Sequence, residues 1–330
     1  MPSSARRLPL RGCKLPIPPS VDPIPGVVYA LRGAALEQRF CDPASFTSRH
    51  AGKIAWMHVP KSGTSFMETV LNYACRLPHA RPSVAALVQQ AMRAPPSAHI
   101  SEWSILDEQF NLSAACFAHR LLDHGRAVRG ADGQIASWRP HVPGRDWAVE
   151  RGHVVALFRE PTQRLLSAWH QAAGPHGVPR PEAARLRSPT EYARYCSKAG
   201  VCVEHKLTQY LIGRQPHSWA DVQEAAAHIE RRDVLFVGLT ELWNLSVCAF
   251  HRQLGGTPQP AEFAPSRQYN GTAKGSSRYF ASELPGYYDE YDEYVYEWAR
   301  SRFVRDVQNL TGWRCAMERW EDGDRLACAE

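Results

Sequence analysis

The stretch IAWMHVPKSGTSFMETV, residues 54–70, decides the expected fold. Its first half is β-prone, which predicts a strand over residues 53–59 that Pro60 ends. Ser65 and Glu68 then have the spacing of a capping box, so a helix is expected to follow. A helix start presents unpaired N–H groups and the positive end of the helix dipole. The short loop between strand and helix is therefore a typical place to bind an anion.

The loop PKSGTSF, residues 60–66, carries the groups that an anion site needs. Gly63 lets the backbone approach a ligand closely, and Lys61 supplies a positive charge. Its hydroxyl donors are Ser62, Thr64 and Ser65. The lysine precedes the glycine, whereas nucleoside-triphosphate loops of the type Gly-x-x-x-x-Gly-Lys-Ser/Thr place it after the glycine. An ordinary kinase or ATPase is therefore disfavoured.

The rest of the chain alternates strands with helices. The apolar runs HVVALF at 153–158 and DVLFVGL at 233–239 predict two more strands, the first of them covered on both faces. Helices are expected from Pro161 to about residue 172 and over residues 189–196, 204–212, 219–231, 241–254 and 287–310, the last one stopped by Gly312. This alternation predicts an α/β fold: a P-loop-like, doubly wound, mainly parallel sheet flanked by helices, with ligands beyond the carboxyl ends of the strands.

The length of 330 residues suits one domain with a ragged start. We expect an N-terminal arm over residues 1–50 and a single domain over residues 51–330. The first 25 residues carry basic side chains, several prolines and no acid before Asp22. They are interpreted as a disordered arm; a transit-like leader and a cut or truncated anchor region stay open. No run approaches the roughly 18 apolar residues of a membrane span, so membrane attachment is expected only through a missing N-terminal anchor.

Two features indicate the secretory route. Four of the five asparagines have the glycosylation pattern Asn-x-Ser/Thr, which a random asparagine would match roughly one time in ten. They are Asn111, Asn244, Asn270 and Asn309. Nine cysteines fit the same compartment. Cys196 with Cys202 is the most plausible local disulfide, and Cys315 with Cys328 is the next.

The charge balance and the cysteine spacing disfavour a nucleic-acid binder and a structural metal site. A formal net charge of +6 fits anionic partners, from a small substrate to a polymer. There is no concentrated basic run and no zinc framework, which disfavours a nucleic-acid binder. No two cysteines have the two-to-four-residue gap of a zinc knuckle, so no structural metal is expected.

A second motif, FREPTQRLLSAW at residues 158–169, follows the second predicted strand. It places Arg159 at the end of that strand, and Arg164 and Ser167 on the helix that comes next. A guanidinium fork and a hydroxyl form a good bidentate clamp for a second phosphate. The sequence therefore predicts two anion-binding segments rather than one.

Together, the segments HVPKSGTSF and LFREPTQRLLSAW resemble the two phosphate-binding signatures of sulfotransferases that use 3′-phosphoadenosine 5′-phosphosulfate (PAPS). The segments at residues 205–214 and 234–251 resemble later segments of the Golgi-type carbohydrate sulfotransferases and their algal relatives. Trp169 stands where a tyrosine is more usual in that family. The resemblance extends from about Lys53 to the final predicted helix.

The resemblance implies a role for each segment. Lys61 would reach the 5′-phosphosulfate and stabilise charge on the bridging oxygen as the sulfuryl group leaves. The rest of the 5′ loop would be Pro60, Ser62, Gly63, Thr64 and Ser65. Arg159 and Ser167 would hold the 3′-phosphate, and Lys274 would contact the nucleotide from a late Lys-Gly loop. No metal is required, because sulfuryl transfer needs mainly positioning and charge stabilisation.

A general base is expected between the two signatures, to accept the proton of the acceptor hydroxyl. His141 is preferred because its His-x-Pro setting resembles the family pattern, His119 follows closely, and Glu68 is a further candidate. The leading hypothesis is a PAPS-dependent sulfotransferase that acts on a hydroxyl, expected to belong to a carbohydrate, in the Golgi lumen. A cytoplasmic enzyme acting on a small metabolite and a non-catalytic nucleotide- or glycan-binding relative are the alternatives.

Overall fold

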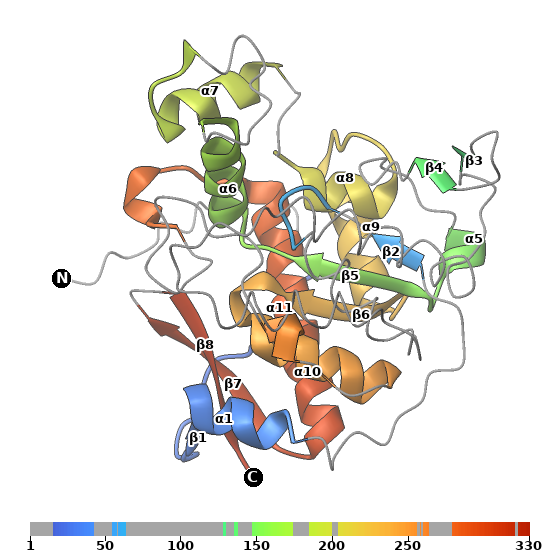
Figure 1. The fold of residues 1–330 in the computed structure, drawn as a ribbon, viewed down its shortest axis with the longest axis vertical. Helices are drawn as coiled ribbons and strands as arrows, with labels where there is room; N and C mark the ends of the chain where they lie inside the picture. The colour runs from blue at the N-terminus through green and yellow to red at the C-terminus, as the bar shows by residue number, and fades with distance from the viewer. Residues whose placement is uncertain are drawn as a thin grey trace, which may run out of the picture.

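The structure is a computed structural model, and Figure 1 shows how its elements are arranged. It describes residues 16–42, 55–57, 59–63, 128–129, 135–137, 147–173, 185–199, 204–255, 258, 260–263, 279–320 and 323–330.

A parallel sheet of three strands holds the first signature, the second signature and the segment that follows them. Its strands are β2 (Ala55–Met57), β5 (Val154–Phe158) and β6 (Val234–Leu239), in the order β2–β5–β6. Both pairings are parallel, with Ala55 opposite Val154 and Val155 opposite Phe236. The three predicted strands are thus present and lie side by side.

The main helices lie close to their predicted positions. They are α6 (Pro161–Ala173), α7 (Pro189–Ala199), α8 (Lys206–Ile212), α9 (Trp219–Glu230), α10 (Trp243–Leu254) and α11 (Glu290–Thr311). Helix α11 begins later than predicted because the side chain of Asp289 caps it, accepting a hydrogen bond from the amide of Asp292. Gly312, with φ of 74°, ends it as predicted. A short 3-10 helix, η3 (Thr240–Leu242), separates β6 from α10.

The parallel sheet is covered on both faces. Every residue of β5 is 0% exposed. Successive side chains of a strand point to opposite faces, so burial of the whole run requires cover on each side. Helices α9, α10 and α11 all pack against β6. In Figure 1, α8 and α9 are drawn above the sheet strands and α10 below them.

A second, antiparallel sheet was not predicted. It consists of β1 (Leu31–Arg32), β8 (Gly323–Ala329) and β7 (Arg314–Trp320), in the order β1–β8–β7. Cys315 and Cys328 stand opposite each other in the β7–β8 hairpin and form a disulfide, which confirms that predicted pair. Cys196 is also disulfide-bonded, but Cys202, its predicted partner, lies outside the described residues.

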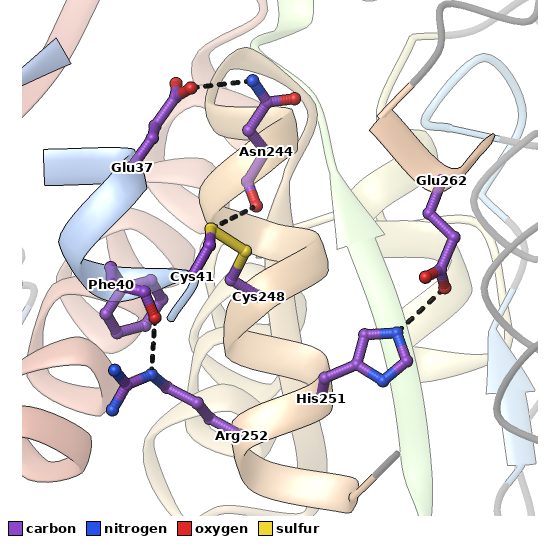
Figure 2. The surroundings of a disulfide bond; sticks show 8 residues. All are labelled: Glu37, Phe40, Cys41, Asn244, Cys248, His251, Arg252 and Glu262. Atoms are coloured by element: carbon purple, nitrogen blue, oxygen red, sulfur yellow. Dashed lines mark hydrogen bonds and ion pairs between the residues drawn. A yellow bond between two sulfur atoms is a disulfide. The ribbon is translucent and has the colours of Figure 1, made fainter. Parts of the chain in front are cut away.

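The described part of the expected N-terminal arm is attached to the core. Helix α1 (Gly33–Phe40) buries Leu36 and Phe40 completely. A disulfide joins Cys41, at the end of α1, to Cys248 of α10, and Figure 2 shows the polar contacts around it. Helix α1 lies within the expected arm, and a disulfide that spans 207 residues of sequence joins its end to α10.

The remaining elements are short. They are β3 (Val128–Arg129), β4 (Ile135–Ser137), α5 (Trp147–Glu150), η4 (Pro260–Phe263) and η5 (Ala281–Glu283). None of the described helices is both long enough and apolar enough to cross a membrane. The disulfides indicate an oxidising environment of the secretory type.

Candidate functional site

The carboxyl ends of the three parallel strands lie at one edge of the sheet. Residues 59–63 follow β2, residues 159–160 follow β5 and residues 240–241 follow β6. In open α/β sheets, ligands bind in the crevice outside this edge. We call these three segments the strand-end site.

The turn after β2 has a backbone in which the sign of φ alternates. Lys61 and Gly63 have φ of 66° and 77°, whereas Ser62 between them keeps a negative φ. The amide of Ser62 donates to the carbonyl of Val59 at 3.1 Å and closes the turn. Neighbouring residues of opposite hand direct backbone N–H groups toward a common concavity that suits an anion. The turn therefore has the handedness of an anion-binding loop.

Gly63 is required by both its conformation and its surroundings. Its positive φ is strained for any residue with a side chain, and a Cβ here would lie 3.1 Å from Leu157 and 3.3 Å from Thr240. The ring of Trp243 would be 3.4 Å away. The Nε1 atom of Trp243 donates to the carbonyl of Glu262 at 2.8 Å, which holds that ring in place. The turn after β2 is thus packed directly against the ends of β5 and β6.

Ser62 is a buried polar residue with unused hydrogen-bonding capacity. Ser62 is only 1% exposed, and its Oγ atom has no hydrogen-bond partner among the described residues. Buried hydroxyl groups are nearly always hydrogen-bonded, because an unpaired one costs about 1–3 kcal/mol. This hydroxyl is therefore a candidate contact for a ligand oxygen.

Arg159 joins the two signatures. Its Nη1 atom donates to the carbonyl oxygen of Lys61 at 3.2 Å, across 98 residues of sequence. Its guanidinium carbon lies 5.4 Å from the centroid of the Tyr279 ring. Burial lowers the pKa of Arg159, yet an arginine remains protonated in proteins. The strand-end site therefore combines a fixed positive charge with the turn that holds Lys61.

Tyr279 is held against α6 by a pair of reciprocal hydrogen bonds. The side-chain amide of Gln163 accepts from the amide of Tyr279 at 2.8 Å and donates to its carbonyl at 3.0 Å. On the other side, the ring of His170 stacks on the Tyr279 ring at 4.7 Å, and Nε2 of His170 lies 3.0 Å from Glu283. Tyr279 is 6% exposed, so its position beside Arg159 is well fixed.

Two carboxylates accept hydrogen bonds from backbone amides at the strand ends. Glu160 accepts from the amides of Thr162 at 3.1 Å and Gln163 at 2.7 Å, and so caps the start of α6. Glu241 accepts from the amide of Glu160 at 3.1 Å and from the Tyr296 hydroxyl at 2.8 Å. Burial raises the pKa of Glu160, and nearby Glu241 raises it further. Glu241 thereby ties the end of β5 to α11.

Arg164 lies away from the strand-end site. Its side chain is fully buried, and its Nη2 atom lies 2.5 Å from Asp292 and 3.6 Å from Asp289, both at the start of α11. The sequence suggested that Arg164 joins a phosphate clamp, whereas this guanidinium is neutralised by two carboxylates. We call these three residues the α6–α11 contact. Ser167, on the same helix, is 4% exposed.

The predicted site residues divide into two groups. Those that the structure describes are Pro60, Lys61, Ser62, Gly63, Arg159 and Ser167, and it brings the Lys61 turn and Arg159 together. Those outside the described residues are Thr64, Ser65, His119, His141 and Lys274. The sequence reading missed Glu241 and Tyr279. Glu241 could have been found because it follows a predicted strand at the ligand-binding edge; no local signal marks Tyr279.

Comparison with known proteins adds no family to this description. No family model matches the chain, and neither a curated protein nor a solved structure matches it significantly. The residues alone make a site with two cationic side chains, a glycine turn and a buried hydroxyl, which are features that suit an anion, beside the carboxylates of Glu160 and Glu241.

Proposed function

We propose that the chain is a PAPS-dependent sulfotransferase with a P-loop-like, doubly wound fold, which transfers a sulfuryl group to a hydroxyl acceptor. One observation carries the proposal: Arg159 of the second signature donates to the carbonyl of Lys61 in the first, at 3.2 Å. Two segments that resemble the 5′-phosphosulfate and 3′-phosphate signatures are therefore neighbours at the ligand-binding edge of a parallel sheet. A nucleotide with separate 5′ and 3′ anionic groups is the ligand that such a pair favours.

The residues at the strand ends fit such a ligand. The Ser62 hydroxyl is buried without a described partner, and Gly63 leaves no room for a Cβ beside the turn. An oxyanion would accept from the hydroxyl and from the N–H groups of the turn. The residues proposed for the 5′-phosphosulfate are Pro60, Lys61, Ser62, Gly63, Thr64 and Ser65. Arg159 and Ser167 are proposed for the 3′-phosphate, with Lys274 as a further nucleotide contact.

Sulfuryl transfer requires the protein mainly to position the reacting groups and to stabilise charge. When bound, PAPS supplies the sulfuryl group, whose bond to the bridging oxygen breaks as the bond to the acceptor oxygen forms. Lys61 places positive charge beside the oxygen that becomes negative, while the turn holds the group in line with the acceptor. We propose His141, or else His119, as the base that accepts the hydroxyl proton. This division of roles needs no metal ion.

We further propose that the acceptor is a carbohydrate hydroxyl and that the protein works in the Golgi lumen. The disulfides Cys41–Cys248 and Cys315–Cys328 support a secretory location, because such bonds persist in oxidising compartments. The similarity of residues 205–214 and 234–251 to the carbohydrate branch supports the acceptor class. A cytoplasmic enzyme for a small metabolite would have reduced cysteines instead.

The direct test is calorimetric titration with 3′-phosphoadenosine 5′-phosphate, with ADP, and with ATP plus magnesium. We expect metal-independent binding of the 3′-phosphorylated nucleotide and at least tenfold weaker binding of ADP. Binding of ATP only with magnesium would favour a kinase, and no binding of any nucleotide would favour a non-catalytic relative. Either result contradicts the proposal.

A pair of variants ties that binding to the site. Arg159→Ala removes a charge-assisted contact and should weaken the 3′-phosphorylated nucleotide about 10- to 100-fold, while ADP binding changes little. Arg194→Ala removes an exposed arginine of α7 and should leave both affinities unchanged. Equal losses for the two nucleotides in Arg159→Ala would show that Arg159 does not read the 3′-phosphate.

A further inference from the structure

Two of the four Asn-x-Ser/Thr patterns lie in described helices, and the surroundings of their asparagines differ. Asn244 stands in the first turn of α10, and Asn309 stands in the last turn of α11. The other two, Asn111 and Asn270, lie outside the described residues. A glycan is bulky and needs a surface position in the folded protein. The two helical sites can therefore be compared on exposure and on the contacts of their side chains.

Asn244 is enclosed by the contact between α10 and α1. Its Nδ2 atom donates to Glu37 of α1 at 2.8 Å, as Figure 2 shows. The hydroxyl of Ser246, the third residue of this pattern, is fully buried and is bonded to the amide and to the carbonyl of Leu239, each at 2.9 Å. One turn later, Cys248 is covalently joined to Cys41. A glycan on Asn244 would displace α1 from this contact.

Asn309 itself has no contact like the one that holds Asn244 against α1. The residue is exposed, and no hydrogen bond of its side chain is found within the part of the chain that the structure describes. Thr311, the third residue of this pattern, donates to the carbonyl of Val307 at 2.8 Å and accepts from the amide of Trp313 at 3.1 Å. These bonds fix the helix end without using Asn309. An oligosaccharide on Asn309 would extend into solvent and break no described contact.

We propose that Asn309 is an N-glycosylation site of the folded protein and that Asn244 stays unmodified. In the modification, Nδ2 of Asn309 forms a bond to the anomeric carbon of an oligosaccharide. The bond from that carbon to the pyrophosphate oxygen of a lipid-linked donor breaks, and the amide loses one proton. The disulfides of this chain indicate the kind of compartment in which such donors are found.

Asn309 is separated along α11 from the strand-end site. Asn309 lies about 20 Å along α11 from Tyr296, the α11 residue that contacts Glu241, at about 1.5 Å per helical residue. Glycosylation of Asn309 does not depend on the proposed sulfotransferase activity, because it is argued from the sequence pattern, the exposure, the hydrogen bonds and the disulfides. Its test needs no acceptor substrate.

The test is site-by-site peptide mapping of the chain expressed behind a secretory leader in eukaryotic cells. The secreted protein is digested with and without prior removal of N-glycans, and each asparagine peptide is read separately by mass spectrometry. We expect the Asn309 peptide to carry a glycan and the Asn244 peptide to be unmodified. A parallel map without reduction checks that Cys41 and Cys248 are joined.

Two variants give the matched comparison. Asn309→Gln should remove one glycan from the mass of the intact protein, and Thr311→Ser, which keeps both the pattern and the hydroxyl, should retain it. An unmodified Asn309 peptide in the secreted, disulfide-bonded protein overturns the proposal. A glycan on Asn244 together with an intact Cys41–Cys248 bond overturns its second half, since α1 would then tolerate what we infer it excludes.

Discussion

Arg159 and Arg164 stand five residues apart in one motif but lie in different electrostatic surroundings. In the strand-end site, Arg159 donates to a carbonyl oxygen, faces a ring and lies in the field of Glu241 and Glu160. In the α6–α11 contact, Arg164 is fully buried and lies within 3.6 Å of two carboxylates. Two carboxylates in direct contact neutralise the guanidinium of Arg164, whereas the described hydrogen bond of Arg159 goes to a neutral carbonyl oxygen. The first arginine of the motif is therefore the one proposed to bind ligand, and the second stabilises the fold.

The largest effect is expected from breaking the α6–α11 contact. Arg164→Met keeps the length and apolar stem of the side chain but leaves Asp292 buried without its cation and Asp289 with only His205 as partner. Removing one partner of a buried ion pair costs about 3–5 kcal/mol. Asp292 also accepts from the amides of Leu207 and Thr208, each at 2.9 Å, so the start of α8 should loosen as well. Urea unfolding followed by circular dichroism measures the loss.

The matched control for that variant is Arg194→Ala on α7, which removes an exposed arginine and should change the unfolding free energy by less than about 0.5 kcal/mol. If Arg164→Met lost no more stability than this control, Arg164 would not be a structural residue. The distinction between the two arginines would then fail.

The strand-end site should show the opposite response, with a large loss of turnover and little loss of stability. Lys61→Ala removes the charge proposed to stabilise the leaving oxygen, so the rate of sulfuryl transfer should fall about 10²- to 10³-fold. Alanine keeps a Cβ at the same positive φ of 66°, so the backbone strain is unchanged. Transfer of labelled sulfate from PAPS measures the rate, and a thermal melt measures stability.

Lys206→Ala, on α8, serves as the control for Lys61→Ala because it removes a lysine outside the strand-end site. Its transfer rate should match that of the unmodified protein. Full turnover in Lys61→Ala would show that Lys61 has no role in the proposed transfer, even if the nucleotide still binds.

The elements that carry this comparison were predictable where the sequence pattern is local. An uninterrupted apolar run gave β5, and the following proline gave the start of α6, because burial and helix initiation are set by neighbouring residues. The β7–β8 hairpin was missed. Its strands mix buried residues such as Met317 with charged ones such as Glu318, so no clean alternation stands out. Attachment of α1 depends on a disulfide to α10, which no local pattern reveals.

The candidate site was predictable in the same uneven way. The Lys61 turn and Arg159 were found because glycine, hydroxyl and cationic residues follow predicted strands. The separate role of Arg164 was not found, since its aspartate partners are 125 and 128 residues away in sequence. Tyr279 was missed for the same reason, because Gln163 and His170 hold it from α6 across more than 100 residues.

A smaller effect on nucleotide affinity is expected from changing Tyr279, whose ring faces Arg159. Tyr279→Leu removes the ring that faces its guanidinium and the stacking with His170, at distances of 5.4 Å and 4.7 Å. A partly desolvated cation–π contact contributes about 0.5–2 kcal/mol, so the affinity for 3′-phosphoadenosine 5′-phosphate should fall about 2- to 30-fold. Tyr279→Phe keeps the ring and should retain the affinity. If both variants lost affinity equally, the hydroxyl rather than the ring would position Arg159.

The smallest effect on stability is expected from Glu293, because charged groups of both regions lie near its carboxyl. Burial, with Glu160 of the strand-end site and Asp289 of the α6–α11 contact nearby, raises its pKa from 4.5 to about 9. Between these values the folded state holds a proton that the unfolded state has lost, so stability falls as the pH rises. The slope is small because Glu293 is partly exposed and solvent screens its carboxyl. In Glu293→Gln, the unfolding free energy measured by urea titration should therefore decline less between pH 5 and pH 9. The control is Glu290→Gln, at an exposed position of the same helix, which should not change the decline. An unchanged decline in Glu293→Gln would mean that the two regions do not meet electrostatically at this residue.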